Sequence, residues 1–285
     1  MNNQNTPLVS VIITTFNVEK FIGNTINSVL NSTFKNYEII LVDDSSDDNT
    51  LNIIKAYAEK EIRIKYYKIE HTGIPAAPRN FGINKSSGSL IAFLDGDDVW
   101  NKDKLFYQVK YLQNNPDKIL VYSMSLTIGE VNVFSPLFEV LPLLHKAAVT
   151  KEDLTAKGNS ITCSSVLVKT EAIKSAGCFD EDIKLKAVED YDLWLRLSDV
   201  GEFGFIPRIH SYYRIHKNQS SADWQTKQAR LDYLSLKRNL NLRKYSYYRN
   251  KNIFIRLARN TFHALTYLYV GALSLADKSK LFMLI

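Results

Sequence analysis

A run of apolar residues that ends abruptly in acids constrains this chain most. Residues 90–94 read Leu-Ile-Ala-Phe-Leu, and Asp95, Asp97 and Asp98 follow at once. Apolar runs without polar alternation are typical of strands buried on both faces, as in a parallel sheet. The carboxyl ends of such strands are where open α/β sheets bind ligands. The three carboxylates repel one another, so we expect a hard divalent cation carrying phosphate oxygens beside them.

The first 125 residues alternate between strand-like and helical patterns. Strands are predicted at residues 9–14, 38–42, 64–69 and 90–94, and helices at about 19–30, 50–60, 79–84 and 102–113. This alternation predicts an α/β fold of βαβ units around a mostly parallel sheet. Asp43 and Asp44 end the second strand much as Asp95 ends the fourth. Because parallel strands end at one edge, we expect both acid clusters to meet in one crevice.

The second half of the chain is less regular. Residues 126–160 have no clear period, and we predict a loop-rich insertion there. Further elements are predicted as a strand at 161–168, a short helix at 171–176, a helix at 188–197, short strands at 203–207 and 211–215, and a helical, basic segment from 222 onward.

The composition of the chain limits the classes of protein to which it can belong. With 285 residues, of which 45% are hydrophobic and 23% charged, one globular α/β domain with a tail is expected. Cys163 and Cys178 have neither metal-ligand nor disulfide-framework spacing, which favours a reducing compartment. The first six residues lack the basic and apolar regions of a signal peptide, so we expect a cytoplasmic protein. Glycine-rich dinucleotide and P-loop motifs are absent, so side chains and metal must hold any phosphate.

Charge is distributed unevenly. Residues 227–285 hold 12 Lys or Arg and 2 Asp, a balance of +10, which leaves −4 for residues 1–226. Such asymmetry indicates an anionic partner, either nucleic acid or a membrane surface. We favour an anionic membrane surface over nucleic acid, because the uncharged stretch 264–276 is too short to span a bilayer and suits interfacial binding. The alternative is an ordinary helical bundle that packs on the domain.

Five motifs occur in order at regular spacing. They are Val-Ser-Val-Ile-Ile-Thr-Thr-Phe-Asn (9–17), Leu-Val-Asp-Asp-Ser-Ser-Asp-Asp-Asn-Thr (41–50), Pro-Arg-Asn-Phe-Gly (78–82), Leu-Asp-Gly-Asp-Asp (94–98) and Glu-Asp-Tyr-Asp-Leu-Trp-Leu-Arg-Leu (189–197). Together they resemble the family 2 glycosyltransferases with the GT-A fold, over roughly residues 8–216. The resemblance implies a GT-A domain at 1–221, with a donor half at about 8–125 and an acceptor half at about 126–221. A basic helical extension would follow at 222–285.

The resemblance also implies a reaction. It is the inverting, metal-dependent transfer of a sugar from a nucleotide-diphosphate donor, with UDP-sugar favoured. The acceptor would be a hydroxyl of a glycan or of a polyprenyl-diphosphate-linked sugar, in cell-surface polysaccharide synthesis. Such an enzyme would be cytoplasmic or peripheral on the inner face of the cell membrane. Whether it would form a homo-oligomer stays an open question.

The acid cluster matches the Asp-x-Asp motif of the family. By this match, Asp97 would bind Mg²⁺ or Mn²⁺ on the donor diphosphate, and His216 would complete the metal shell. Asp95 would reach the ribose or the metal shell, with Gly96 beside it at the nucleotide sugar. Asp98 is a secondary candidate. The metal would neutralise charge on the departing diphosphate.

A second set of residues matches the nucleotide pocket of the family. Asp44 corresponds to the position that meets the nucleobase, and Thr15, Phe16 and Asn17 would line the same pocket. A carboxylate only accepts hydrogen bonds, so Asp44 would read the N3–H of uracil, which cytosine lacks.

Two assignments stay open on the sequence. Arg79 would contact the base or the diphosphate, or else form a salt bridge with Asp43 or Asp44. His216 would be either a metal ligand or a structural residue. The other histidines match no family motif: they are His71, His145, His210 and His263.

The motif that begins with Glu189 and Asp190 supplies the expected catalytic base. By the match, Asp190 would remove the proton of the acceptor hydroxyl, while Glu189 and Asp192 would tend to raise its pKa. The alternative is structural, because acids in the first turn of a helix are favoured by the helix dipole.

Two rival functions remain. Asp95 to Val99 also fits the Asp-x-Asp-x-Thr/Val motif of haloacid-dehalogenase-type phosphatases, although that class also needs a strand-end Thr or Ser, a Lys and a later acidic pair. Glu189 and Asp190 begin a predicted helix rather than end a strand, and the motif lies unusually far into the chain. A nucleotide-sugar-binding module without catalysis is the non-enzyme alternative. Release of free phosphate without an acceptor would favour the first rival, and donor binding without transfer would favour the second.

Overall fold

The computed structural model describes residues 6–129, 140–141, 147–216 and 224–242. The strands are β1 (Val9–Thr15), β2 (Tyr37–Asp43), β3 (Ile64–Lys68), β4 (Leu90–Asp95), β5 (Val99–Trp100), β6 (Lys118–Gly129), β7 (Val140–Leu141), β8 (Val166–Lys169) and β9 (Glu202–Ile215). The helices are α1 (Ile22–Leu30), α2 (Thr50–Ala58), α3 (Ala76–Lys85), α4 (Lys104–Asn114), α5 (Lys151–Lys157), α6 (Thr170–Ser175), α7 (Glu189–Val200) and α8 (Trp224–Lys237). Short 3₁₀ turns form η2 (Cys163–Ser165) and η3 (Ile183–Leu185).

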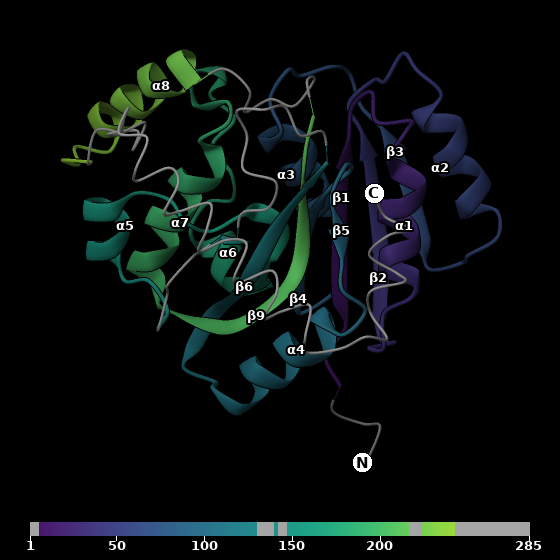
Figure 1. Ribbon diagram of the computed structural model, residues 1–285, viewed down its shortest axis with the longest axis horizontal. Helices are drawn as coiled ribbons and strands as arrows, with labels where there is room; N and C mark the ends of the chain where they lie inside the picture. The colour runs from purple at the N-terminus through teal and green to yellow at the C-terminus, as the bar shows by residue number, and fades with distance from the viewer. Residues whose placement is uncertain (1–5, 130–139, 142–146, 217–223, 243–285) are drawn as a thin grey trace, which may run out of the picture.

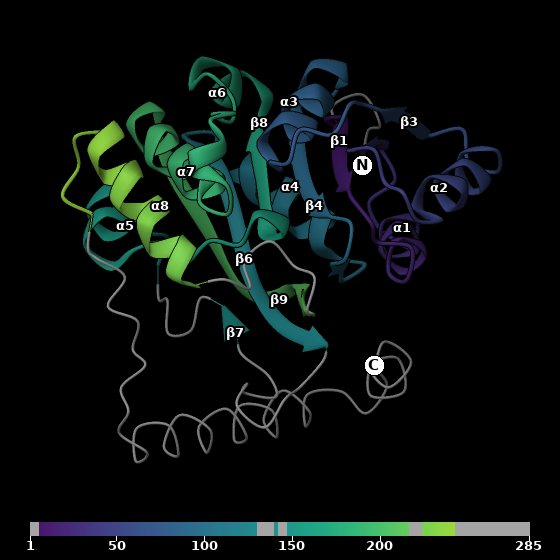
Figure 2. The same ribbon diagram turned by 90° about the horizontal axis from the view of Figure 1, so that it is seen from above.

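Within the described residues the strands form one mostly parallel sheet, in the order β3-β2-β1-β4-β8-β6-β9-β5, and β7 pairs with β6. Strands β3, β2, β1 and β4 are parallel to one another, and β8 runs antiparallel between β4 and β6. Helices flank the sheet on both sides (Figures 1 and 2). The predicted α/β fold class is confirmed.

The register of the central strands brings the acidic strand ends together. β1 lies between β2 and β4, and its Thr15 pairs with Asp43 while Thr14 pairs with Asp95. The predicted meeting of these strand ends at one edge of the sheet is therefore confirmed.

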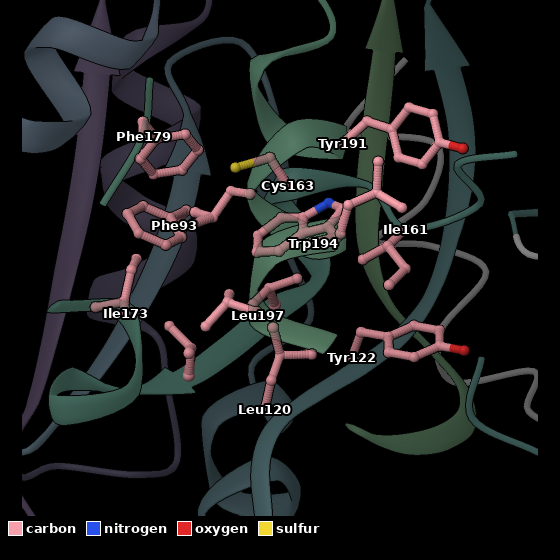
Figure 3. Packing of buried hydrophobic residues seen from close by; sticks show 14 of the residues in the cluster. Phe93, Leu120, Tyr122, Ile161, Cys163, Ile173, Phe179, Tyr191, Trp194 and Leu197 are labelled. Carbon is pink, nitrogen blue, oxygen red and sulfur yellow. The ribbon is translucent and has the colours of Figure 1, made fainter. Parts of the chain in front are cut away.

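Alternate residues of the central strands enter two separate hydrophobic cores. In β4, Leu90, Ala92 and Leu94 pack with α1, α2 and α4, whereas Ile91 and Phe93 pack with α3, α6 and α7. Figure 3 shows the second core, in which the indole of Trp194 lies among side chains from several elements. Because helices cover both faces, the strand has no polar face, which explains its unbroken apolar sequence.

The predicted loop-rich insertion at 126–160 is wrong in part. It contains the end of β6, together with β7 and α5. The capping box of Thr150 and Asp153 begins α5, since each side chain accepts from the other's backbone N–H.

The two strands predicted at 203–207 and 211–215 form one continuous strand, β9. The register against β6 jumps from Ser123–Ile206 to Met124–Ile209. This bulge accommodates Pro207, which cannot donate to a sheet ladder, so the strand continues past it. The strand predicted at 161–168 is η2 followed by the shorter β8.

The described part of the C-terminal extension packs on the domain. Leu231 and Leu234 of α8, and Leu242 after it, belong to the core of α3, α6 and α7. In the part of the chain that the structure describes, no helix is both long and apolar enough to cross a membrane. Residues 243–285, which carry most of the basic charge, lie outside the described residues. The boundary at 221/222 stays a prediction.

Candidate active site

The end of β1 is tied to the end of β2 by a buried carboxylate. Asp43 is fully buried and accepts hydrogen bonds from the Oγ1 of Thr15 at 3.0 Å and from the hydroxyl of Ser46 at 2.6 Å. Asn17 adopts φ 53°, and its side-chain oxygen accepts from the N–H of Asp47. Of the predicted pocket residues, Thr15 is thus buried and engaged, whereas Phe16 and Asn17 are exposed.

The carboxylate of Asp44 contacts two residues that the sequence analysis did not single out for the site, His71 and Thr72. Its Oδ1 accepts from the backbone N–H of Thr72 at 2.9 Å and from the Thr72 hydroxyl at 3.0 Å. Its Oδ2 lies 2.9 Å from the Nδ1 of His71, and the His71 ring stacks on Phe16 with centroids 4.4 Å apart. His71 and Thr72 therefore form one contact cluster with Phe16 and Asp44.

Arg79 joins the end of β4 to the start of α7. Its buried guanidinium donates to Asp95 at 2.8 Å and to Glu189 at 2.7 Å. Arg79 and Glu189 are 110 positions apart in the sequence. The predicted alternative of a salt bridge from Arg79 to Asp43 or Asp44 is wrong. Burial raises the pKa of Asp95, and the positive charge of Arg79 opposes that rise.

The loop after β4 is shaped by the close approach of Gly96 to β1. A Cβ at Gly96 would lie 2.9 Å from the carbonyl oxygen of Thr14, so only glycine fits without displacement. This contact directs the next residue, Asp97, toward His216: Asp97 Oδ2 and His216 Nε2 are 2.8 Å apart. The Nε of Arg214 donates to the carbonyl of Asp97 at 2.8 Å.

Asp98 is held by neighbouring elements on both of its carboxylate oxygens. It is fully buried, and its carboxylate accepts from the Ser164 hydroxyl at 2.6 Å and from the N–H of Arg214 at 2.8 Å. Burial raises its pKa well above the usual range, and the neighbouring charges of Asp97 and Asp95 add to that rise. Asp98 therefore fixes the loop to β9 and η2.

Asp190 stands at the first turn of α7, next to Glu189. It is half-buried; its Oδ1 accepts from the N–H of Tyr191 at 2.7 Å, and Asn159 Nδ2 lies 3.5 Å from Oδ2. Glu189 is buried, and its Oε2 has no hydrogen-bond partner among the described residues. The Arg79–Glu189 ion pair therefore holds the first turn of α7, which carries Asp190, next to the end of β4.

The donor set for a metal is partial. Within the described residues, no three His, Cys, Asp or Glu side chains gather closely enough to hold a metal ion. Asp97 and His216 do lie together, and the carboxylate suits Mn²⁺ or Mg²⁺ whose other ligands would come from phosphates and water. The imidazole is a ligand of transition metals rather than of Mg²⁺, so the pair fits Mn²⁺ better. These residues fit a metal that arrives with a diphosphate.

Sequence reasoning missed three contributors to this site, namely His71, Thr72 and Glu189. Glu189 was visible only as a neighbour of Asp190. His71 follows the third strand by a few residues, which places it at the ligand-binding edge of the sheet, and that position was the available indication.

The model of the family described as glycosyl transferase family 2 matches residues 10–169, more than half of the chain. The chain belongs to this family. The Escherichia coli UDP-Glc:alpha-D-GlcNAc-diphosphoundecaprenol beta-1,3-glucosyltransferase WfaP is 31% identical over 217 residues, covering 76% of this chain and 80% of WfaP.

Solved structures agree on the GT-A fold of this family 2 chain. S. aureus TarS in complex with UDP-GlcNAc superposes with a TM-score of 0.65 at 20% identity, covering 83% of this chain and 68% of that one. The mannosyltransferase PcManGT from Pyrobaculum calidifontis, in complex with GDP-Man and Mn²⁺, gives a TM-score of 0.62 at 19% identity, covering 98% and 80%. Membership of family 2 favours glycosyl transfer over the phosphatase alternative.

Proposed function

We propose that this glycosyltransferase moves a sugar, with inversion, from a nucleotide-diphosphate donor to a hydroxyl acceptor. The observation that carries the proposal is the Arg79 bridge, which holds Glu189 and Asp95 on one guanidinium. It supports a single site in which Asp190 acts on the acceptor hydroxyl and the acids after β4 bind the donor.

In the proposed step, Asp190 takes the proton of the acceptor hydroxyl. The acceptor oxygen attacks the anomeric carbon from the face opposite the nucleotide, the bond from that carbon to the diphosphate oxygen breaks, and its electron pair leaves with the diphosphate. A positioned base of this kind contributes about 10²–10⁴-fold to the rate.

Asp97 and His216 would hold Mg²⁺ or Mn²⁺, which when bound neutralises charge that grows on the departing diphosphate. Asp98, fixed by Ser164 and Arg214, holds the Asp97 loop in place. Asp44 and Phe16 would receive the base, while Thr15 and Asn17 shape the strand ends behind it. Asp95 and Gly96 would face the ribose and diphosphate.

The donor and acceptor follow the named relative. The name of WfaP gives UDP-Glc as its donor and a sugar linked to diphosphoundecaprenol as its acceptor. We extend this to a UDP-sugar and a lipid-diphosphate-linked glycan in surface polysaccharide synthesis for the present chain. The basic C-terminal residues would hold the enzyme against the anionic inner face of the cell membrane.

Substitution Asp190→Asn tests the proposal, because the amide cannot take the proton. We expect sugar transfer to fall at least about 10²-fold while the dissociation constant of the donor stays unchanged. Transfer is measured as the mass shift of lipid-linked acceptors, and donor binding by calorimetry with Mn²⁺. The matched control is Asp199→Asn, an exposed acid in the last turn of the same helix.

Near-normal turnover of Asp190→Asn would contradict the assignment of the base. Failure of the unchanged protein to bind any nucleotide sugar would contradict the proposed function as a whole.

A further inference from the structure

The carbonyl groups of the loop after β4 are held by side chains from two other elements. The hydroxyl of Thr25, in α1, lies 2.9 Å from the carbonyl oxygen of Gly96 and 2.8 Å from that of Asp98. A hydroxyl has a single proton to donate, so these two oxygens share it. The carbonyl of Asp97, between them in sequence, accepts from Nε of Arg214 at 2.8 Å. Because Thr25 is fully buried, the peptide units on both sides of Asp97 are fixed from α1 without help from water.

His216, which pairs with Asp97, rests on the same turn of α1. The ring of Phe21, at the N-cap of the helix, lies 5.0 Å from the His216 ring between centroids. The guanidinium carbon of Arg214 lies 4.8 Å from the centroid of Phe21. The N–H of Thr25 donates to the carbonyl of Phe21 at 3.1 Å, and the Thr25 hydroxyl lies 3.3 Å from the same oxygen. One closed turn of α1 therefore contacts the loop of Asp97 through Thr25 and the ring of His216 through Phe21.

We propose that Thr25 and Phe21 are positioning residues that set the separation of Asp97 and His216 for Mn²⁺ carried on a diphosphate. This inference rests on the proposed function, in which that pair holds the metal. Metal–ligand distances are fixed to within about 0.2 Å, so a donor atom that shifts with its loop binds the metal less well. Groups that orient metal ligands typically contribute about 10–100-fold to metal affinity.

Two substitutions of Thr25 separate its hydroxyl from its size. Thr25→Val keeps the volume of the side chain and removes the hydroxyl. The carbonyls of Gly96 and Asp98 then lose a donor in the protein interior, where an unmade hydrogen bond is costly. We expect the loop to shift in response, and Asp97 to shift with it. Thr25→Ser keeps the hydroxyl and loses only a methyl group, so it should preserve the position of Asp97.

Ser28 offers a matched control on the same helix. Its buried hydroxyl donates to the carbonyl of Thr25 at 2.7 Å and accepts from the N–H of Trp100 at 3.1 Å. Ser28→Ala therefore loosens α1 from β5 but leaves the hydroxyl contacts to the carbonyls of Gly96 and Asp98 in place. A role of Thr25 in the general stability of α1 would be shared by Ser28, whereas a role in positioning Asp97 would not.

The aromatic contact is tested separately. Phe21→Leu keeps an apolar side chain at the N-cap of α1 but removes the ring that contacts His216 and Arg214. Phe106→Leu is the control, because Phe106 is 45% exposed and its ring contacts Tyr107 of the same helix, α4.

The experiment measures the dissociation constant of Mn²⁺ for the full chain in the presence of UDP, from the electron paramagnetic resonance signal of free Mn²⁺. We expect this constant to rise about tenfold in Thr25→Val and about threefold in Phe21→Leu. Thr25→Ser, Ser28→Ala and Phe106→Leu should match the unchanged protein. Binding of UDP without metal, measured by calorimetry, should be equal in all of them.

The inference is overturned if Thr25→Val binds Mn²⁺ as tightly as the unchanged protein does, or if Ser28→Ala weakens binding to the same extent. Should Thr25→Val fail to fold, the Phe21→Leu variant decides, and a dissociation constant equal to that of Phe106→Leu overturns the inference. If the unchanged protein with UDP binds no Mn²⁺, the metal-binding part of the proposed function fails, and this inference fails with it.

Discussion

At the scale of single residues, the site depends on one buried cation shared by two acids. The side chain of Arg79 is 5% exposed and that of Glu189 4%, so water screens their charges little. Two carboxylates paired with one guanidinium give the cluster of three side chains one net negative charge. Glu189 Oε2 is the atom on which this charge is least compensated among the described residues.

Replacing Arg79 with Met is expected to destabilise the fold by about 3–5 kcal/mol, because it leaves buried carboxylates without their counter-charge. The free energy of unfolding in urea measures the change. Arg63→Met is the matched control, since Arg63 forms a partly exposed ion pair with Glu61 and should cost less than about 1 kcal/mol. Equal losses in both variants would show that the Arg79 bridge is not a buried ion pair in solution.

His210 gives the stability of the protein a pH dependence. Burial, with the charges of Lys104 and Arg208, lowers the pKa of His210 to about 4. The unfolded chain binds the same proton near pH 6.5, as an unperturbed histidine does. Between these two values the unfolded state holds more protons, so stability falls as the pH drops through this window and the loss is complete below about pH 4.

We expect the His210→Phe variant to lose about 2 kcal/mol less stability than the unchanged protein between pH 7 and pH 5. Phenylalanine keeps the stack on Tyr107, whose ring centroid lies 5.5 Å from that of His210, and it does not titrate. Urea unfolding across this pH range measures the difference. Parallel pH profiles for the two proteins would refute the assignment.

At the scale of elements, α8 is bound to α7, the helix that begins with Glu189 and Asp190. Asp192 of α7 is fully buried and accepts from Arg196 at 2.9 Å and from Arg238, just after α8, at 2.5 Å. Arg238 also reaches Asp180 at 2.7 Å. The start of the C-terminal extension is therefore a part of the domain that supports the site.

Arg238→Met should cost about 1–3 kcal/mol, because Asp192 keeps Arg196 but loses its second charged partner. The measurement is the free energy of unfolding. Arg230→Met on α8, where the arginine donates to the carbonyl of Lys186, is the control and should cost less. An unchanged free energy of unfolding in Arg238→Met would contradict the docking of α8 through Arg238.

The elements that sequence predicts well are those whose environment is uniform. β1, β2 and β4 are covered by helices on both faces, so their sequences are largely apolar, and the buried polar pair Ser10 and Glu38 is hydrogen-bonded. β6 escaped prediction because it buries hydroxyls: Ser125 is fully buried and bonds with Thr162 and Ser211. The Arg79–Glu189 contact joins residues 110 positions apart, and no local pattern indicates such a pair.

At the scale of the whole molecule, charge separates along the chain. Residues 243–285 hold eight Lys or Arg and one Asp, while the part before residue 227 is net negative. A polypeptide ending at residue 242 would keep Leu231, Leu234 and Leu242, which belong to the core.

We expect the full chain to float with vesicles that contain anionic lipid and the 1–242 form to remain in solution. Each basic residue near the surface contributes about 1 kcal/mol to binding, and added salt weakens it. Neutral vesicles are the control. If both forms float equally, the C-terminal residues do not mediate membrane binding.

The place of β8 in the sheet bears on how the chain is synthesised. β4 pairs with β1 along one edge, but its other edge pairs with β8, which ends at Lys169. A ribosome therefore releases β1 to β4 long before their neighbour exists. During that interval the edge of β4 exposes unpaired N–H and C=O groups that another chain can bind. Fragments that stop before Lys169 should aggregate, and nascent chains of this length are the ones that need a chaperone.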